Sequence, residues 1–289
     1  YLMTEFDTTI YLLFEGRDFV IELDFVEGTS IQQPTIEYST KISNQVFALA
    51  PVVRPGYTFV EWAFAWKDAT DHSAQAPAVA TGNIELAANV YGDITLTAVW
   101  QPNTYTITYY PNSGTGNEVT DQVVFDSQYT VRPSDLYYKT GYTFVGWNTT
   151  SDGSGTSYDN QATIKNLVES GTITLYAMWK EHTYKVVFNA NNDSSDSVEQ
   201  EFTYTENKAL SINTFEKEGY TFEGWSTSEN GRKEYENSQT VEKLTTIDQD
   251  VFNLYAVWVA NDYTIKFDGN GAEGSMADLA MSYDVAKQL

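Results

Sequence analysis

Few side chains in this sequence could carry catalysis. Its 289 residues include no cysteine and only two histidines, His72 and His182. The lack of cysteine excludes disulfides, thiolate metal sites and cysteine nucleophiles, and no Gly-x-Ser-x-Gly segment supplies a serine nucleophile for a histidine base. His72 follows Asp68 and Asp71 in a polar segment, but one histidine with two carboxylates is a weak metal signal. We therefore predict no catalytic residue, no metal site and no cofactor.

Two other patterns are typical of enzymes but have simpler interpretations. Residues 269–274 match the Gly-x-Gly-x-x-Gly turn of dinucleotide-binding folds, which requires a long helix and a second parallel strand after it. The repeat described below instead predicts a turn between strands at this position. The 40 Asp and Glu residues could include a glycosidase pair, but such a pair needs a deep cleft, which small repeated modules rarely build. We therefore predict that the chain is not an enzyme.

The charge of the chain excludes some classes of partner. The 16 Lys and Arg residues against 40 Asp and Glu give a formal net charge of −24. Such a surface repels the phosphates of nucleic acids and the headgroups of anionic lipids. No apolar run approaches the roughly 18 residues that a membrane-spanning helix needs. We expect no nucleic-acid partner, no membrane insertion of this segment, and a monomer.

Three sequence patterns recur along the chain. The first is Gly-Tyr-Thr-Phe-x-x-Trp, the second is Ala-x-Trp, and the third is a tyrosine five residues after the second. Their positions are 56–62, 141–147 and 219–225 for the first, 98–100, 177–179 and 256–258 for the second, and 105, 184 and 263 for the third. The second and third patterns recur every 79 residues. Three independent patterns in one register predict a tandem repeat.

These patterns divide the chain into repeats. We predict a tail of a preceding repeat (1–18), a first repeat with a longer middle loop (19–100), a second (101–179), a third (180–258) and a truncated fourth (259–289). Only four residues separate the last tryptophan of one repeat from the first tyrosine of the next, and none of these connectors contains a Gly-Ser run. Short connectors give successive domains little room to fold back on one another. We therefore expect an elongated array.

Each repeat has the pattern of a mainly β module. Phe19, Ile21 and Leu23 alternate with polar or smaller residues, which is the period-2 pattern of a half-buried strand. The Ala-x-Trp segments, the Gly-Tyr-Thr-Phe segments and residues 122–129 predict further strands. Residues 163–167 and 240–244 could each form one helical turn. The expected fold class is therefore α+β with mostly β-strands.

The same residues resemble a known family. Tyr-Thr-Ile-x-Phe at 263–267, Gly-Tyr-Thr-Phe-x-Gly-Trp at 141–147 and Leu-Tyr-Ala-x-Trp at 175–179 together resemble the Listeria–Bacteroides repeat, also called the internalin B-repeat. The resemblance implies a small β-grasp-like (ubiquitin-related) module, arrayed in tandem on large bacterial surface and secreted proteins. It does not imply an enzyme. The first repeat departs from the pattern, because Glu61 stands where the other repeats have glycine.

The tryptophans fall into two groups. Six recur at fixed positions and share strand faces with leucine and alanine, so we interpret them as structural core anchors: Trp62, Trp100, Trp147, Trp179, Trp225 and Trp258. Trp66 has no counterpart in the other repeats and lies near the longer loop that contains His72. A non-repeated aromatic residue in an elongated loop favours a ligand contact. Phe64, Trp66 and His72 are therefore our ligand-binding candidates.

The sequence therefore predicts a non-catalytic function. We expect a stalk, spacer or adhesive repeat segment of a bacterial cell-surface or secreted protein, located outside the cell. The alternative is a ligand-recognition module that binds a host protein or a surface polysaccharide through the exposed aromatic loop of the first repeat.

Overall fold

The structure, a computed structural model, describes residues 18–24, 35–39, 45–49, 51–87, 89–271 and 273–287. The predicted tail at residues 1–18 lies outside the described residues except for Asp18. The chain forms two compact units. The first contains the described residues up to Thr108 with Val119–Val131 and Thr163–Thr174, and the second contains Tyr109–Glu118, Arg132–Ala162 and the described residues from Leu175 onward. Residues of the predicted second repeat thus contribute to both units.

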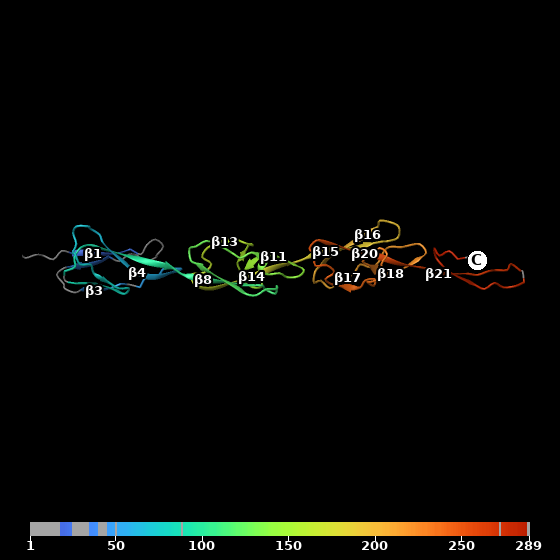
Figure 1. Ribbon diagram of the computed structural model, residues 1–289, viewed down its shortest axis with the longest axis horizontal. Helices are drawn as coiled ribbons and strands as arrows, with labels where there is room; N and C mark the ends of the chain where they lie inside the picture. Colours follow the sequence, from blue (N-terminus) through green and yellow to red (C-terminus); the bar gives the residue numbers. More distant parts are fainter. Residues whose placement is uncertain are drawn as a thin grey trace, which may run out of the picture. The chain divides into compact units, whose positions relative to one another are not determined.

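The first repeat, in which Figure 1 labels β1, β3 and β4, contains a mixed four-stranded sheet in the order β2-β1-β7-β4. Its strands are β1 (Asp18–Asp24), β2 (Thr35–Ser39), β4 (Tyr57–Trp66) and β7 (Ile94–Pro102). The first strand, β1, runs parallel to the last strand, β7, and both outer pairs are antiparallel. A second, three-stranded sheet has the order β3-β6-β5, with β3 (Gln45–Ala48), β5 (Ala78–Val79) and β6 (Asn83–Leu86).

The third repeat has the same arrangement. Its main sheet has the order β16-β15-β20-β18, and β15 is again parallel to β20. The strands are β15 (Thr183–Asn189), β16 (Ser197–Thr203), β18 (Tyr220–Ser226) and β20 (Asp250–Ala260), with a small pair β17 (Lys208–Ala209) and β19 (Thr240–Val241). After it, β21 (Asp262–Ile265) and β22 (Leu279–Ser282) form an antiparallel pair. Residues 269–274 lie between these two strands, with Ala272 outside the described part, so no second parallel strand follows the glycine pattern here.

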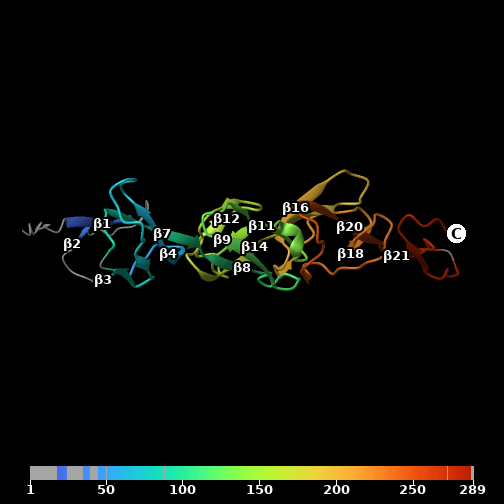
Figure 2. The same ribbon diagram turned by 60° about the vertical axis from the view of Figure 1, so that its left-hand side comes forward.

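The second repeat supplies the elements between these two. They are β8 (Thr104–Tyr110), β9 (Val119–Val124), β10 (Tyr129–Thr130), η1 (Ser134–Leu136), β11 (Tyr142–Asn148), β12 (Ser157–Tyr158), β13 (Thr163–Ile164) and β14 (Gly171–Glu181). β11 pairs antiparallel with both β12 and β14 (Figure 2), and β10 pairs with β13. Almost all described elements are strands, as the sequence predicts.

Alternating burial explains why these segments are strands. In β1 the side chains of Phe19, Ile21 and Leu23 are buried, and in the parallel β7 those of Ile94 and Leu96 are fully buried opposite them. These residues belong to one core cluster of the first repeat, and a separate cluster that includes Trp225 belongs to the third. The first and third repeats therefore have their own hydrophobic cores.

The two predicted helical turns are wrong. Residues 163–167 and 240–244 instead begin with the short strands β13 and β19, which pair with β10 and β17 and carry the buried side chains of Ile164 and Val241. Positive φ angles then prevent a helical turn, with 55° at Asn166 and 54° at Lys243. In the part of the chain that the structure describes, the one helical element is the three-residue 3-10 turn η1, drawn as a short coiled ribbon in Figure 2.

A buried amide holds the loop after β11 in place. Asn148 is 1% exposed, and its Nδ2, which carries two N–H groups, lies within hydrogen-bond distance of the carbonyls of Gly153 (3.1 Å) and Gly155 (3.2 Å) and of Ser157 Oγ (2.9 Å). Its Oδ1 accepts from the amide (2.9 Å) and hydroxyl (3.0 Å) of Thr150 and from the Gly155 amide (3.1 Å). One side chain thus satisfies polar groups along the whole loop.

Candidate functional site

The structure brings the three ligand-binding candidates of the first repeat together. The Trp66 and His72 rings stack with centroids 4.7 Å apart and planes 6° apart. Phe64 meets Trp66 edge-on, at 4.9 Å and 84°. All three side chains are half-buried, and Phe64 and Trp66 also pack against the core of the repeat. We call these three residues the aromatic group of the first repeat.

The aromatic group differs from the sequence prediction in one respect. Phe64 and Trp66 lie in β4 and not in a loop, because β4 has ten residues where β11 and β18 have seven. The extra residues continue the strand's alternation and extend its pairing with β7 as far as Trp66 opposite Ile94. Since the strand is longer, only the segment that carries His72 is a loop.

His72 is fixed by its neighbours. Its Nδ1 lies 2.8 Å from the Ser73 carbonyl, its Nε2 lies 3.2 Å from the Ala69 carbonyl, and the ring covers one side of Trp66. In the same loop, hydrogen bonds from the Thr70 amide and hydroxyl lower the pKa of Asp68. Among the described residues no three His, Asp or Glu side chains gather as metal ligands would. This loop therefore has the features of a packed turn that holds the His72 ring against Trp66.

The second histidine, His182, lies beside a threonine hydroxyl, an arrangement in which a histidine could act as a base on a nucleophile. His182 Nε2 is 2.9 Å from Thr143 Oγ1, and its Nδ1 is 2.8 Å from the Thr246 carbonyl. The corresponding contact in the neighbouring repeats is a threonine hydroxyl on an asparagine. It joins Thr58 Oγ1 to Asn103 Oδ1 and Thr221 Oγ1 to Asn261 Oδ1, at 2.6 Å in both cases. Asparagine makes the corresponding contact in both neighbouring repeats and cannot act as a base, so this position of the repeat does not require one.

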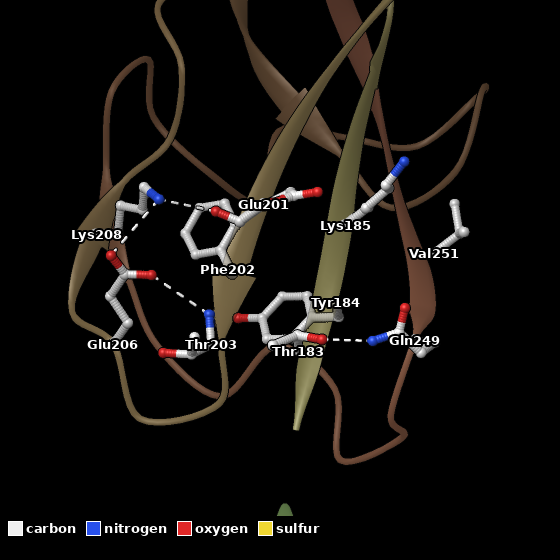
Figure 3. Close-up of a pocket in the computed structure, with 10 residues that line it drawn as sticks. All are labelled: Thr183, Tyr184, Lys185, Glu201, Phe202, Thr203, Glu206, Lys208, Gln249 and Val251. Atoms are coloured by element: carbon white, nitrogen blue, oxygen red, sulfur yellow. Dashed lines mark hydrogen bonds and ion pairs between the residues drawn. The ribbon is translucent and has the colours of Figure 1, made fainter. Parts of the chain in front are cut away.

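A hollow of about 630 Å³ opens in the third repeat between β15, β16 and β20 (Figure 3). Its floor is formed by the stacked rings of Tyr184 and Phe202, whose centroids are 5.6 Å apart. Burial raises the pKa of the Tyr184 phenol. Sequence reasoning missed this hollow, because its wall combines residues between 183 and 208 with Gln249 and Val251, which lie far along the chain from them.

Each of the two lysines at the hollow has an acidic partner. Lys208 Nζ lies over the Phe202 ring at 5.3 Å, donates to the Glu201 carbonyl at 2.8 Å and is 3.5 Å from Glu206 Oε1 (Figure 3). On the other side, Lys185 Nζ bonds Glu199 Oε2 at 2.8 Å. The hollow lacks a nucleophile held by a base, and its geometry supports no specific reaction.

The recurring tryptophans occupy two different environments. Trp62, Trp147 and Trp225 are at most 5% exposed, whereas Trp100, Trp179 and Trp258 are half-buried. The phenylalanine of each Gly-Tyr-Thr-Phe motif contacts both. In the third repeat, for example, the ring centroid of Phe222 lies 5.0 Å from that of Trp225 and 5.6 Å from that of Trp258. The half-buried rings also use their N–H groups, since Trp179 Nε1 donates to the Pro111 carbonyl and Trp258 Nε1 to the Ala190 carbonyl, both at 2.9 Å.

The fold and these sites define a class of protein, a tandem array of small, mainly β modules. Sequence comparison identifies the family. The profile of the Listeria-Bacteroides repeat domain matches residues 24–89, 105–178 and 184–257, and the chain belongs to this family. The resemblance predicted from the sequence is thereby confirmed.

Two curated relatives come from Evansella cellulosilytica. One, named "Putative Gly-rich membrane protein", is 32% identical over 223 residues, which cover 75% of this chain and 24% of the relative. The other, named "Putative membrane protein", is 27% identical over 188 residues, which cover 62% of this chain and 25% of the relative. The chain thus spans about a quarter of the length of the curated relatives it matches. Among the described residues, no helix has the length and apolar character needed to cross a bilayer.

Proposed function

We propose that this chain is a spacer segment of a bacterial surface protein, in which β-grasp-like repeats in series hold other parts of the protein away from the cell envelope. The family and the names of the two relatives support a surface location outside the cell. The parallel pairing of the first and last strands of a repeat supports the β-grasp-like assignment, with extended segments in place of a helix.

The observation that carries the spacer proposal is the connection between repeats. Only one residue separates the last strand of a repeat from the first strand of the next: Asn103, His182 or Asn261. The backbone N–H of each donates to the carbonyl of Gly56, Gly141 or Gly219 of the preceding repeat, at 2.8–2.9 Å. A one-residue connector that is hydrogen-bonded at this point leaves little freedom for a hinge.

The chemistry of the chain agrees with a passive role. Its net charge of −24 favours solubility and disfavours nucleic acid and anionic membranes as partners. Repeats that each bury a core need few contacts beyond their immediate neighbours, and a series of them extends by simple addition. We propose that the array acts as a monomer and is extended, which small-angle X-ray scattering in solution tests.

A second candidate function is recognition of a host protein or a surface polysaccharide by the first repeat. The observation that favours it is the aromatic group, since Phe64, Trp66 and His72 converge in a repeat whose longer β4 has no equivalent in the others. Flat aromatic rings at a half-exposed position are suited to stacking on sugars and to protein contacts.

This second function makes a direct prediction. If the first repeat binds a glycan or a matrix protein, the triple variant F64A/W66A/H72A should lose that binding while its far-ultraviolet circular dichroism stays native. Glycan and matrix-protein arrays probed with the whole chain measure the loss. The matched control is Tyr91→Ala, which removes an exposed aromatic of the same repeat outside the group. Undiminished binding by the triple variant would rule out the aromatic group as the site.

A further inference from the structure

A tight turn with a basic residue precedes each Gly-Tyr-Thr segment. The amide of Tyr142 donates to the Lys139 carbonyl at 3.0 Å, and the Lys139 ammonium lies over the Tyr142 ring, 4.0 Å from its centroid. The same turn and cation contact join Arg54 to Tyr57 and Lys217 to Tyr220. Each tyrosine of the motif therefore has a cation over one face of its ring and is held in place by its own repeat.

The following repeat contacts the same tyrosines. An aromatic residue at the turn after the second strand of the next repeat meets each ring edge-on. The pairs, with the distance between ring centroids and the angle between ring planes, are Tyr57 with Phe125 (5.7 Å, 74°), Tyr142 with Tyr204 (6.2 Å, 78°) and Tyr220 with Tyr283 (5.7 Å, 75°). The three partners are half-buried and lie 79 residues apart, so they occupy one repeat position.

The glycine of the motif lets this aromatic ring approach closely, because glycine has no Cβ atom. A Cβ atom built on Gly56, Gly141 or Gly219 would lie only 2.3, 2.1 or 2.4 Å from the ring of the next repeat. Each glycine also has a φ near +76°, as its turn requires. Gly171 is a useful comparison, because its φ of +82° is similar but no atom beyond its chain neighbours lies within 4 Å of the position that a Cβ would take. It therefore shows the effect of the backbone conformation without that of a neighbouring ring. The motif glycines therefore serve the neighbouring repeat as well as their own turn.

Backbone hydrogen bonds complete the contact. The carbonyl of each connector residue accepts the amide of the docked aromatic, at 2.8 Å for Asn103 and Phe125 and at 3.0 Å for His182 and Tyr204. The residue that follows the docked aromatic adds a hydrogen bond, and its partner differs between the repeats. Tyr57 Oη donates to Asp126 and Tyr220 Oη donates to Asp284, whereas Thr205 donates to Glu181 instead.

We propose that the Gly-Tyr-Thr segment of each repeat is a docking site for the aromatic turn of the following repeat, so that neighbouring repeats stabilise one another. The partner that fits this site is another copy of the same repeat module. We call this contact the inter-repeat joint. Through this joint, the stability of one repeat depends on its neighbour. The proposal does not depend on whether the chain is a surface spacer.

The joint between the second and third repeats gives a test in the full chain. Urea unfolding followed by hydrogen exchange with mass spectrometry reports the stability of each repeat. Gly141→Ala should lower the folding equilibrium constant of the second repeat about tenfold more than Gly171→Ala, since both strain a positive φ but only the first overpacks Tyr204. Tyr204→Ala alone should destabilise both neighbours, whereas the matched control Tyr138→Ala, at a 64% exposed residue, should not.

The double variant G141A/Y204A decides the interpretation. Removal of the Tyr204 ring should reduce the additional cost of Gly141→Ala to the level of Gly171→Ala, and it should restore folding if the single glycine variant does not fold. The backbone amides of residue 204 and of His182 should also exchange at least about tenfold faster in Tyr204→Ala than in the unchanged chain. Equal effects of the two glycine variants, strict additivity in the double variant, or unchanged exchange of these amides would overturn the joint.

Discussion

Replacing Trp225 by alanine should unfold the third repeat while the first repeat keeps its native structure. Trp225 is 1% exposed, and its ring centroid lies 4.9 Å from that of Phe188 and 5.0 Å from that of Phe222 in the core of that repeat. Removal of a fully buried tryptophan costs roughly 3–5 kcal/mol. A small module cannot absorb such a loss, because whole domains are stable by only about 5–15 kcal/mol.

Hydrogen exchange resolved by peptide measures this result repeat by repeat. Peptides from β15 to β20 should lose protection, and peptides from β1, β4 and β7 should retain it. A suitable control is Tyr263→Ala, which removes an aromatic ring that is 47% exposed in β21. Simultaneous loss of protection in all repeats would mean that the chain has a single cooperative core, contrary to the separate clusters observed.

The second large effect concerns the loop after β11. Asn148→Asp keeps the size of the side chain but replaces a double donor with a carboxylate, which cannot donate to the carbonyls of Gly153 and Gly155. A buried charge that faces unsatisfied acceptors should destabilise the fold by roughly 3 kcal/mol or more at neutral pH. The loss should become smaller in acid, because a protonated carboxyl regains one donor and loses its charge.

Thermal and urea unfolding of the full chain at pH 7 and in acid measure this effect. Asn160→Asp is the matched control, since it introduces the same charge at an exposed position whose amide makes only a 3.4 Å contact with Ser134. If the two variants were equally stable, the Asn148 network would not hold the loop.

Sequence periodicity was sufficient for much of the architecture. The alternation in Phe19, Ile21 and Leu23 predicted a strand, and the structure places β1 there with these side chains buried. The helical turn predicted at 163–167 was wrong, because two β-branched residues found a partner strand, β10, that local pattern could not reveal. Short segments of this kind are decided by tertiary pairing and not by propensity.

The sites were less predictable than the strands. The sequence identified Trp66 and His72 as neighbours in an unusual segment, but not their stacking, which depends on how far β4 extends along β7. The role of the motif glycines was also hidden, because the ring that approaches Gly141 belongs to Tyr204 of the next repeat. The 79-residue spacing of the docked aromatics was visible in the sequence, but their partners become apparent only in three dimensions.

Small-angle X-ray scattering of the chain tests the central proposal most directly. A compact body of 289 residues would have a radius of gyration of about 19 Å. Repeats in series with one-residue connectors should give a clearly larger value and the cross-section of one small module. Added salt should shorten the particle only slightly, because the joints and not charge repulsion would set its length. A radius of gyration close to 19 Å would mean that the repeats pack side by side, and the spacer proposal would then be wrong.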